Sequence, residues 1–165
     1  MKTLLLILIT TTLTSCGQTT KNINSDKNPM TVTQMDTATI AIIPFENTSN
    51  WTLFKNCKPS NLTNTDITEI EQILIKCIDN YNTEPEQKKG NIDNTINLAS
   101  YKRQYVPVIN EKEEKEVWIN CFCNDWDRDW KKGIIQVLDG GKCYFNLKIN
   151  LTTKTYYDLI VNGDG

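Results

Sequence analysis

The chain has 165 residues, the size of a single domain, and its 39% hydrophobic content is enough for a core of ordinary size. Its formal net charge of −2 argues against a nucleic-acid partner, because proteins that bind nucleic acid carry an excess of basic residues. Histidine is absent, which excludes Ser-His and Cys-His catalytic pairs and every histidine metal ligand. We therefore expect no metal, no other cofactor and no nucleic-acid partner.

The N-terminal segment has the order of a bacterial export signal. Lys2 precedes the apolar run Leu4–Ile9, which is too short to span a membrane as a mature helix. The run ends in Leu13-Thr14-Ser15-Cys16, which resembles the lipobox of bacterial lipoproteins. The resemblance implies that residues 1–15 are a removable signal peptide and that Cys16 becomes a lipid-bearing N-terminus in contact with the membrane. An ordinary secretory signal with an incidental cysteine is the alternative.

The residues after the signal indicate location and domain organisation. Gly17 stands where an aspartate would retain a lipoprotein at the inner membrane, so the resemblance implies the cell envelope and an outer-membrane anchor facing the periplasm. Residues 16–37 are rich in Thr, Asn, Gln, Ser and Lys, which predicts a flexible tether. Residues 38–165 are then left to form one α+β domain.

The first elements of this domain are an extended segment and a helix. The apolar run Ala38–Phe45 contains Pro44 and predicts an edge strand or an extended lead-in. Trp51, Leu53 and Phe54 are expected to form a hydrophobic flap over the core. Apolar residues at helical spacing predict a helix over Asp66–Asn82. Its start matches a capping box, with Asp66, Thr63 or Thr65 as the N-cap.

After residue 100 the apolar pattern changes to period two, which is typical of strands. Strands are expected over residues 101–109, 116–123, 134–138, 142–151 and 155–161. Pro107 indicates an edge position for the first of them. Asp139-Gly140-Gly141 predicts a tight hairpin turn between the third and the fourth.

This order of elements predicts an α+β fold with one main helix packed on an antiparallel sheet of four to five strands. The order is similar to cystatin-like, NTF2-like and PepSY-like folds, which implies a cystatin-like or PepSY-like architecture. The stretches Val117–Cys123, Asp139–Phe145 and Ile149–Leu151 resemble small Bacteroidetes lipoproteins, and that resemblance implies no activity. The catalytic histidine of NTF2-like enzymes has no counterpart here.

Five cysteines follow Cys16, and an extracytoplasmic compartment permits disulfides between them. They are Cys57, Cys77, Cys121, Cys123 and Cys143. We predict a Cys57–Cys77 bridge and a bridge from Cys121 or Cys123 to Cys143, with buried free thiols as the alternative. A redox pair at Cys121-Phe122-Cys123 would lack the helix N-terminus that activates such thiols. A zinc site formed by the last three cysteines with Asp125 would lack the usual ligand spacing.

The segment 124–130 alternates acidic and aromatic residues: Asp125, Trp126, Asp127, Asp129 and Trp130. Aromatic side chains surrounded by charge are typical of interface hot spots, so a recognition loop is one interpretation. A solvated loop whose tryptophans pack on the sheet is the other. A calcium loop would need Gly and Glu where Trp130 and Gln136 stand.

These features together predict a lipid-anchored, extracytoplasmic, non-catalytic binding module, of which an inhibitor or immunity protein is one form. Its partner would be an unknown envelope protein, or a small ligand held between helix and sheet. Two alternatives stay open: an enzyme or thiol-redox protein that uses Cys121 and Cys123, and a structural accessory lipoprotein of an envelope complex.

Overall fold

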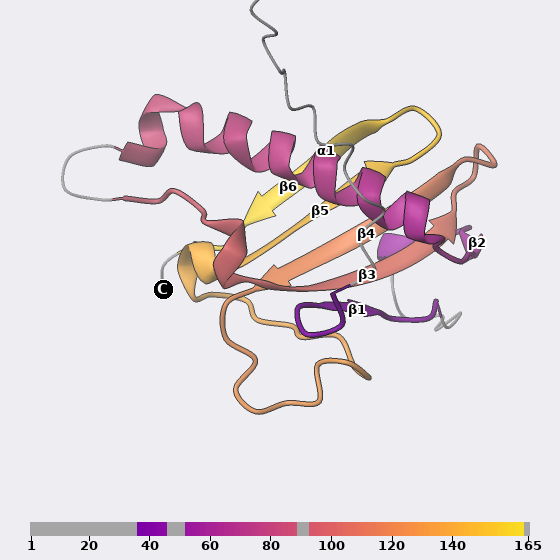
Figure 1. The fold of residues 1–165 in the computed structure, drawn as a ribbon, viewed down its shortest axis with the longest axis horizontal. Helices are drawn as coiled ribbons and strands as arrows, with labels where there is room; N and C mark the ends of the chain where they lie inside the picture. The colour runs from indigo at the N-terminus through magenta and orange to yellow at the C-terminus, as the bar shows by residue number, and fades with distance from the viewer. Residues whose placement is uncertain (1–35, 46–51, 89–92, 164–165) are drawn as a thin grey trace, which may run out of the picture.

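A computed structural model describes residues 36–45, 52–88 and 93–163 (Figure 1). Its strands are β1 (Ile40–Ile42), β2 (Lys58–Pro59), β3 (Lys102–Ile109), β4 (Lys115–Phe122), β5 (Tyr144–Asn150) and β6 (Thr155–Val161). Its helix is α1 (Asn64–Thr83), and its short 3₁₀ helices are η1 (Thr52–Phe54), η2 (Pro85–Lys88), η3 (Leu98–Ser100) and η4 (Gly141–Cys143). The predicted signal peptide, Cys16 and Trp51 lie outside the described residues.

Helix α1 forms where the apolar stripe was predicted. The side chains that it buries are Ile67, Ile70, Leu74, Cys77 and Ile78. Thr63 is the N-cap: its hydroxyl accepts a hydrogen bond from the Asp66 backbone N–H at 3.1 Å. The Asp66 carboxylate accepts in return from the Thr63 backbone N–H at 2.7 Å, which completes a capping box. The helix prediction is therefore confirmed, and the helix ends before Pro85.

The strands form one sheet in the order β1-β3-β4-β5-β6, with β2 paired to β3 on the side where β1 lies. β1 is parallel to β3, and all other pairs are antiparallel. The α+β class is confirmed: one main helix crosses one face of the sheet (Figure 1). In the described part of the chain the sheet has six strands, more than the four to five expected, and it is mixed.

Pro107 does not mark an edge strand, because β3 has neighbours on both sides. The backbone N–H of Arg103 donates to Thr39 and the carbonyl of Tyr105 accepts from Ile43, so these odd-numbered residues of β3 face β1. By alternation the backbone nitrogen of Pro107 points to the same side. At this position β1 has already ended, and the pairing with β2 begins only at Val108. The missing N–H therefore falls in the gap between two short neighbours, where it costs no ladder hydrogen bond.

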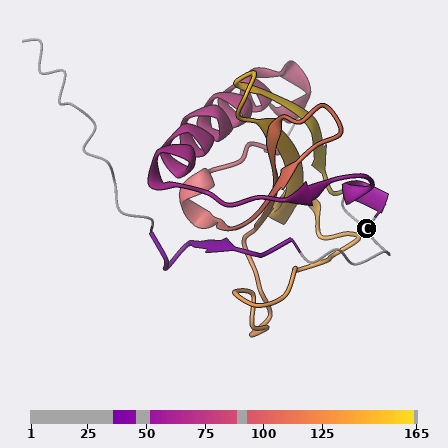
Figure 2. The ribbon, with the colours of Figure 1, turned by 90° about the vertical axis from the view of Figure 1, so that its right-hand side faces the viewer.

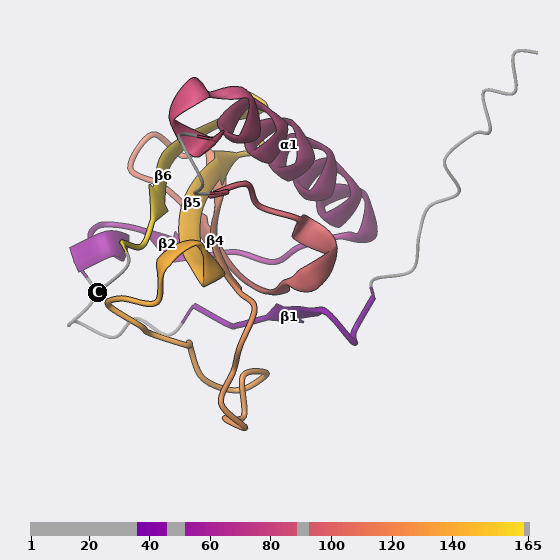
Figure 3. The same cartoon turned by 90° about the vertical axis from the view of Figure 1, so that its left-hand side faces the viewer.

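The sheet separates two hydrophobic cores, with α1 on one side and the β4–β5 connection on the other (Figures 2 and 3). The inner core joins the α1 stripe to Ile40, Tyr105, Val117, Ile119, Cys121, Phe145, Leu147 and Ile149. The outer core contains Ala41, Ile43, Phe54, Val106, Val108, Trp118, Phe122, Trp130, Ile135 and Tyr144. Phe54 thus forms part of the expected flap, and its ring meets Trp118 edge-on at 6.0 Å between centroids.

The segment 134–138 is not a strand, and the hairpin predicted at Asp139-Gly140-Gly141 does not form. Instead the connection from β4 to β5, apart from η4 at its end, folds as an irregular loop over the outer face of the sheet (Figure 3). We call residues 123–143 the outer loop. Its backbone is held by side chains of the sheet, which is why it needs no strand partner.

Two buried amides, Gln104 of β3 and its cross-strand partner Asn120 of β4, hold the outer loop. The Gln104 amide nitrogen donates to the carbonyls of Trp130 at 2.5 Å and Gly133 at 2.7 Å. Its oxygen accepts from the Ile135 N–H and from the Asn120 amide, each at 3.0 Å. The Asn120 amide also donates to the Ile135 carbonyl at 2.8 Å. The loop backbone is thereby satisfied inside the protein, as burial requires.

Candidate functional site

A disulfide closes the outer loop at its two ends. Cys123 follows β4, Cys143 precedes β5, and the two are bonded across a sequence separation of 20. The Cys123 N–H also donates to the Cys143 carbonyl at 2.9 Å. The sequence predicted a bridge to Cys143 from either Cys121 or Cys123, and the structure shows that Cys123 forms it.

The predicted Cys57–Cys77 bridge is wrong, because the two side chains lie on opposite sides of the sheet. Cys77 belongs to the inner core under α1, whereas Cys57 packs against the outer core. Both are free thiols, as is Cys121. Burial raises the pKa of the Cys77 thiol to about 11, so it stays protonated and unreactive at neutral pH.

Cys121 and Cys123 do not form a vicinal redox pair. Cys121 is fully buried in the inner core, and its burial raises the pKa of its thiol far above the usual range. Cys123 is committed to Cys143. A dithiol that exchanges with a substrate needs an accessible thiolate, and Cys121 cannot supply one.

The aromatic residues of segment 124–130 do not form one exposed surface. Trp130 is 7% exposed and packs in the outer core, whereas Trp126 is 52% exposed and meets the Tyr144 ring at 6.1 Å. Arg128 lies over the Trp126 ring at 5.1 Å. A recognition surface in this loop would therefore have Trp126 as its single aromatic anchor.

The three aspartates of the loop have different environments. Asp125 pairs with Lys102 at 2.5 Å, and Asp129 pairs with Lys132 at 2.7 Å. Asp127 is exposed. Among the described residues no group of three or more cysteines and carboxylates is placed to hold a metal ion.

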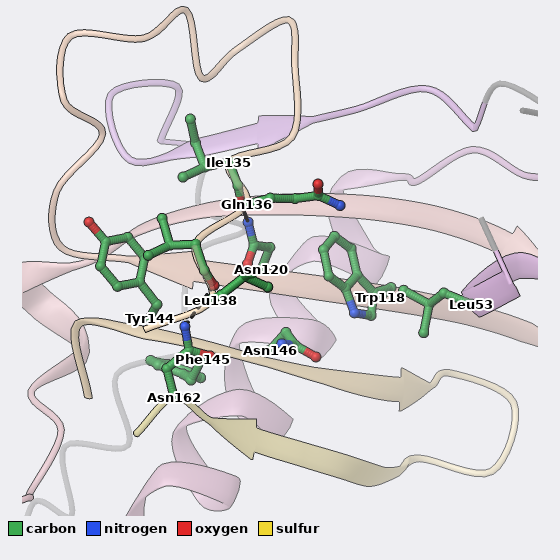
Figure 4. Close-up of a pocket in the computed structure, with 11 residues that line it drawn as sticks. Leu53, Trp118, Asn120, Ile135, Gln136, Leu138, Tyr144, Phe145, Asn146 and Asn162 are labelled. Carbon is green, nitrogen blue, oxygen red and sulfur yellow. Dashed lines mark hydrogen bonds between the residues drawn. The ribbon is translucent and has the colours of Figure 1, made fainter. Parts of the chain in front are cut away.

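A pocket of about 550 Å³ lies on the outer face of β4 and β5, beside the outer loop (Figure 4). Trp118 and Asn120 of β4 and Asn146 of β5 form its floor. Leu138 of the outer loop is fully exposed at its rim. Asn162 fixes that rim by donating to the carbonyls of Val137 at 2.8 Å and Asp139 at 2.9 Å.

Two further pockets continue this hollow along the strands. Leu53, Trp118 and Asn146 also line a pocket of about 140 Å³, whose other wall includes Ile160 of β6. Leu53 and Lys148 then connect it to a pocket of about 480 Å³ that contains Glu116 and Tyr157. We call the three together the outer groove. It follows β4 and β5 from Asn120 to Glu116, four residues or roughly 13 Å.

The chemistry of the outer groove changes along its length. At the Asn120 end the lining is apolar and amide-rich, and within the described residues the side chains of Gln136 and Asn146 make no hydrogen bond. In the middle Ile160 is 57% exposed beside the Trp118 ring. At the Glu116 end carboxylates and a phenol line the pocket. The groove thus offers apolar, amide and charged contacts to one ligand.

Comparison with protein-family models, curated proteins and solved structures finds no match to this chain. The likeness to cystatin-like and PepSY-like folds therefore rests on the order of the elements alone. No described helix is long and apolar enough to cross a membrane.

Sequence reasoning missed the outer groove. Alternation in β4 and β5 puts Trp118, Asn120, Asn146 and Lys148 on one face, opposite the Phe145 and Leu147 side. That alternation could have identified these four residues as neighbours on one face of the sheet. It could not show that the outer loop covers β3 and leaves this half of the sheet open.

Proposed function

We propose that this protein is a non-catalytic binding module of the bacterial cell envelope, anchored by lipid on Cys16, and that it binds its partner in the outer groove. The observation that carries the proposal is the groove itself: a hollow along three strands with apolar side chains left in solvent at its rim. Exposed apolar residues around a concave surface are typical of interaction sites.

An extended polypeptide segment suits the groove best. Trp118, Leu138 and Ile160 offer apolar contacts to side chains. The amides of Gln136 and Asn146 can both donate to and accept from peptide groups. An envelope protein with an exposed strand or tail is therefore the expected partner, and an inhibitor or immunity protein would use the groove in the same way.

The binding proposal is tested by capture with matched variants. Full-length protein in detergent is immobilised and exposed to solubilised envelope extract. Ile160→Lys places a charge in the groove, whereas Ile75→Lys places the same charge on α1, at a residue that is 50% exposed and far from the groove in the fold. A stoichiometric partner that is kept by I75K and lost by I160K supports the proposal. A partner kept by both would contradict it.

The same capture separates the groove from the outer-loop surface. Trp126→Ala removes the exposed aromatic anchor of the loop and leaves the groove lining intact. If W126A loses the partner and I160K keeps it, the binding site is the loop, which was one of the two interpretations of its sequence. The reverse pattern assigns it to the groove.

The anchor is tested independently. Cells that express the protein are labelled with an alkyne analogue of palmitate, and the protein is examined for label and for membrane association. Label on the wild-type chain that disappears in Cys16→Ser supports lipidation. Equal membrane association of both forms without label would mean that the cysteine is not the anchor.

A further inference from the structure

The Glu116 end of the outer groove contains an acidic wall whose charges are not paired. Glu111, Glu114 and Glu116 line this pocket, and none of them forms an ion pair among the described residues. The wall therefore presents negative charge to whatever enters the pocket.

The lysines that line the same pocket leave this wall unpaired. Lys148 is the lysine of this pocket that belongs to a strand, β5. It pairs with Asp158 of β6 at 3.3 Å and not with a glutamate of the wall. Its ammonium also lies over the Tyr157 ring, 5.6 Å from the centroid. Lys55 and Lys112 are exposed at the rim, and neither forms an ion pair with a described carboxylate.

Neutral groups hold these carboxylates in place. The Asn110 amide donates to Glu116 at 3.2 Å and to Glu114 at 3.3 Å, and Asn150 donates to Glu114 at 2.8 Å. The hydrogen bonds from Asn150 and Asn110 lower the pKa of Glu114 below its usual value, so it is charged at neutral pH. Such donors orient a carboxylate without cancelling its charge.

Glu116 is the central group of this pocket. Its side chain extends from β4 and the residue is only 6% exposed. One carboxylate oxygen accepts from Asn110 and from the Tyr157 hydroxyl. Burial, reinforced by this hydrogen bond, raises the pKa of Tyr157, so the phenol keeps its proton and acts as the donor. The other oxygen has no hydrogen-bond partner among the described residues and is available to a ligand.

We propose that this pocket binds a primary alkylammonium group, with the Glu116 carboxylate as its counter-ion. A buried carboxylate without a cation is costly, and an incoming ammonium would remove that cost. Leu53 and the Tyr157 ring provide an apolar wall for the methylene stem that carries the ammonium. A metal ion is a poorer fit, since no set of three ligating side chains is assembled among the described residues.

The ammonium can come from two sources: a lysine side chain of the polypeptide in the outer groove, or a free amine. A lysine of the bound polypeptide as the source rests on the proposed function. It would also fix the register of that polypeptide, because the pocket lies at one end of the groove. The second does not need a groove partner.

Cys57 supplies a local readout, because its half-buried thiol lines the same pocket. The alkylation rate of Cys57 by iodoacetamide is measured by mass spectrometry on the full-length protein in detergent. The probes are n-butylamine, spermidine, Nα-acetyl-lysine amide and its Nε-acetylated, uncharged form. Cys77 and Cys121 serve as internal references, since both are buried in the inner core.

The matched variants are Glu116→Gln and Glu113→Gln. The E116Q substitution preserves the shape and an acceptor oxygen and removes the charge, whereas Glu113 is an exposed residue that pairs with Lys58 outside the pocket. We expect the charged probes to slow alkylation of Cys57 in the wild type and in E113Q. In E116Q the concentration needed should rise about tenfold or more, as for the loss of a charged hydrogen bond.

Each result decides between the possibilities. Equal protection by the uncharged lysine, or unchanged protection in E116Q, overturns the alkylammonium site and leaves the groove proposal intact. Protection by spermidine or butylamine but not by lysine amide assigns the site to a free amine. Protection by lysine amide, together with loss of the captured partner in E116Q, assigns it to a lysine of the partner. Protection by the amines with no partner in any capture would refute the groove proposal alone.

Discussion

Two tryptophans four residues apart in the outer loop have opposite environments, and this difference is visible only in the folded structure. Trp130 packs edge-on against Phe122 at 5.9 Å in the outer core. Trp126, with a positive φ of 47°, turns its ring toward Tyr144 and solvent. Acidic neighbours surround both of them in the sequence, so local composition cannot tell which one is buried.

We expect this difference to appear in stability. Trp130→Ala should lower the free energy of unfolding by about 3–5 kcal/mol, because it removes a large buried ring and leaves a cavity. Trp126→Ala should lower it by less than about 1 kcal/mol, as for a surface site. Urea denaturation followed by circular dichroism measures both. Similar losses in the two variants would mean that the loop does not pack as described.

Gln104 is the residue on which the outer loop depends most. Gln104→Leu keeps the approximate size and leaves four groups without a partner: the Trp130 and Gly133 carbonyls, the Ile135 N–H and one N–H of the Asn120 amide. We expect a loss of about 3 kcal/mol or more, since each stranded buried group costs about 1–3 kcal/mol. Hydrogen exchange of the Ile135 amide should accelerate at the same time. Gln136→Leu, at an exposed residue of the same loop, is the control and should change little.

At the scale of elements, α1 is attached to the sheet at its first turn. Lys115, the first residue of β4, pairs with the Asp66 carboxylate at 2.6 Å while that carboxylate also caps the helix. Burial alone would raise the pKa of Asp66, but the hydrogen bonds from Lys115 and Thr63 outweigh it and the pKa is lowered. One side chain thus serves both the helix terminus and its docking to the sheet.

This lowered pKa predicts how stability changes in acid. A carboxyl group whose pKa is lower in the folded state stabilises the protein above its unfolded pKa of about 3.9 and loses that effect as the pH falls through the folded value. Asp66→Asn should therefore cost about 1 kcal/mol at pH 7, the usual value of a helix cap. The difference from wild type should begin to shrink as the pH falls below about 4 and should vanish below the lowered pKa of the folded state.

Urea denaturation at pH 7 and pH 3 measures the effect. Asp79→Asn, at an exposed residue near the other end of α1, is the control and should lose no stability at either pH. A deficit in D66N that is as large at pH 3 as at pH 7 would contradict the role of the charge.

At the scale of the whole molecule, one sheet forms a wall of both cores. Neither core can lose its packing without exposing side chains of the same strands, so we expect a single cooperative unfolding transition. Tryptophan fluorescence reports mainly on the outer core through Trp118 and Trp130, and the helical circular dichroism signal reports on α1. The two urea curves should coincide. Separate midpoints would show that the outer face unfolds independently.

The fold was predictable to the extent that it follows local patterns. Helical spacing predicted α1, and alternation predicted β3 to β6, because each of these elements buries one face of its own. The parallel pairing of β1 with β3 could not be predicted from the sequence, because the two strands are about 60 residues apart in the chain. The segment 134–138 looked like a strand because it is rich in apolar residues, but the amides that replace its strand partner come from Gln104 and Asn120.

The candidate site was less predictable than the fold, for a related reason. The cysteine pairing failed at Cys57 and Cys77 because sequence does not tell on which side of a sheet a connecting segment passes. The outer groove exists because the outer loop covers one half of the sheet and not the other. That division is set by the hydrogen bonds of two buried amides, and their spacing carries no signature in the chain.

The place where the chain enters the domain has a mechanical consequence. Asp36 closes a turn onto Ala38 and Thr39, and the three residues of β1 then insert Ile40 into the inner core and Ala41 into the outer core. If the N-terminus is held at a membrane while the groove holds a partner, tension reaches the domain through β1 first. β1 lies at one end of the sheet and the groove lies on β4 to β6, so β1 can peel away and lengthen the tether before the load disturbs the strands that hold the partner.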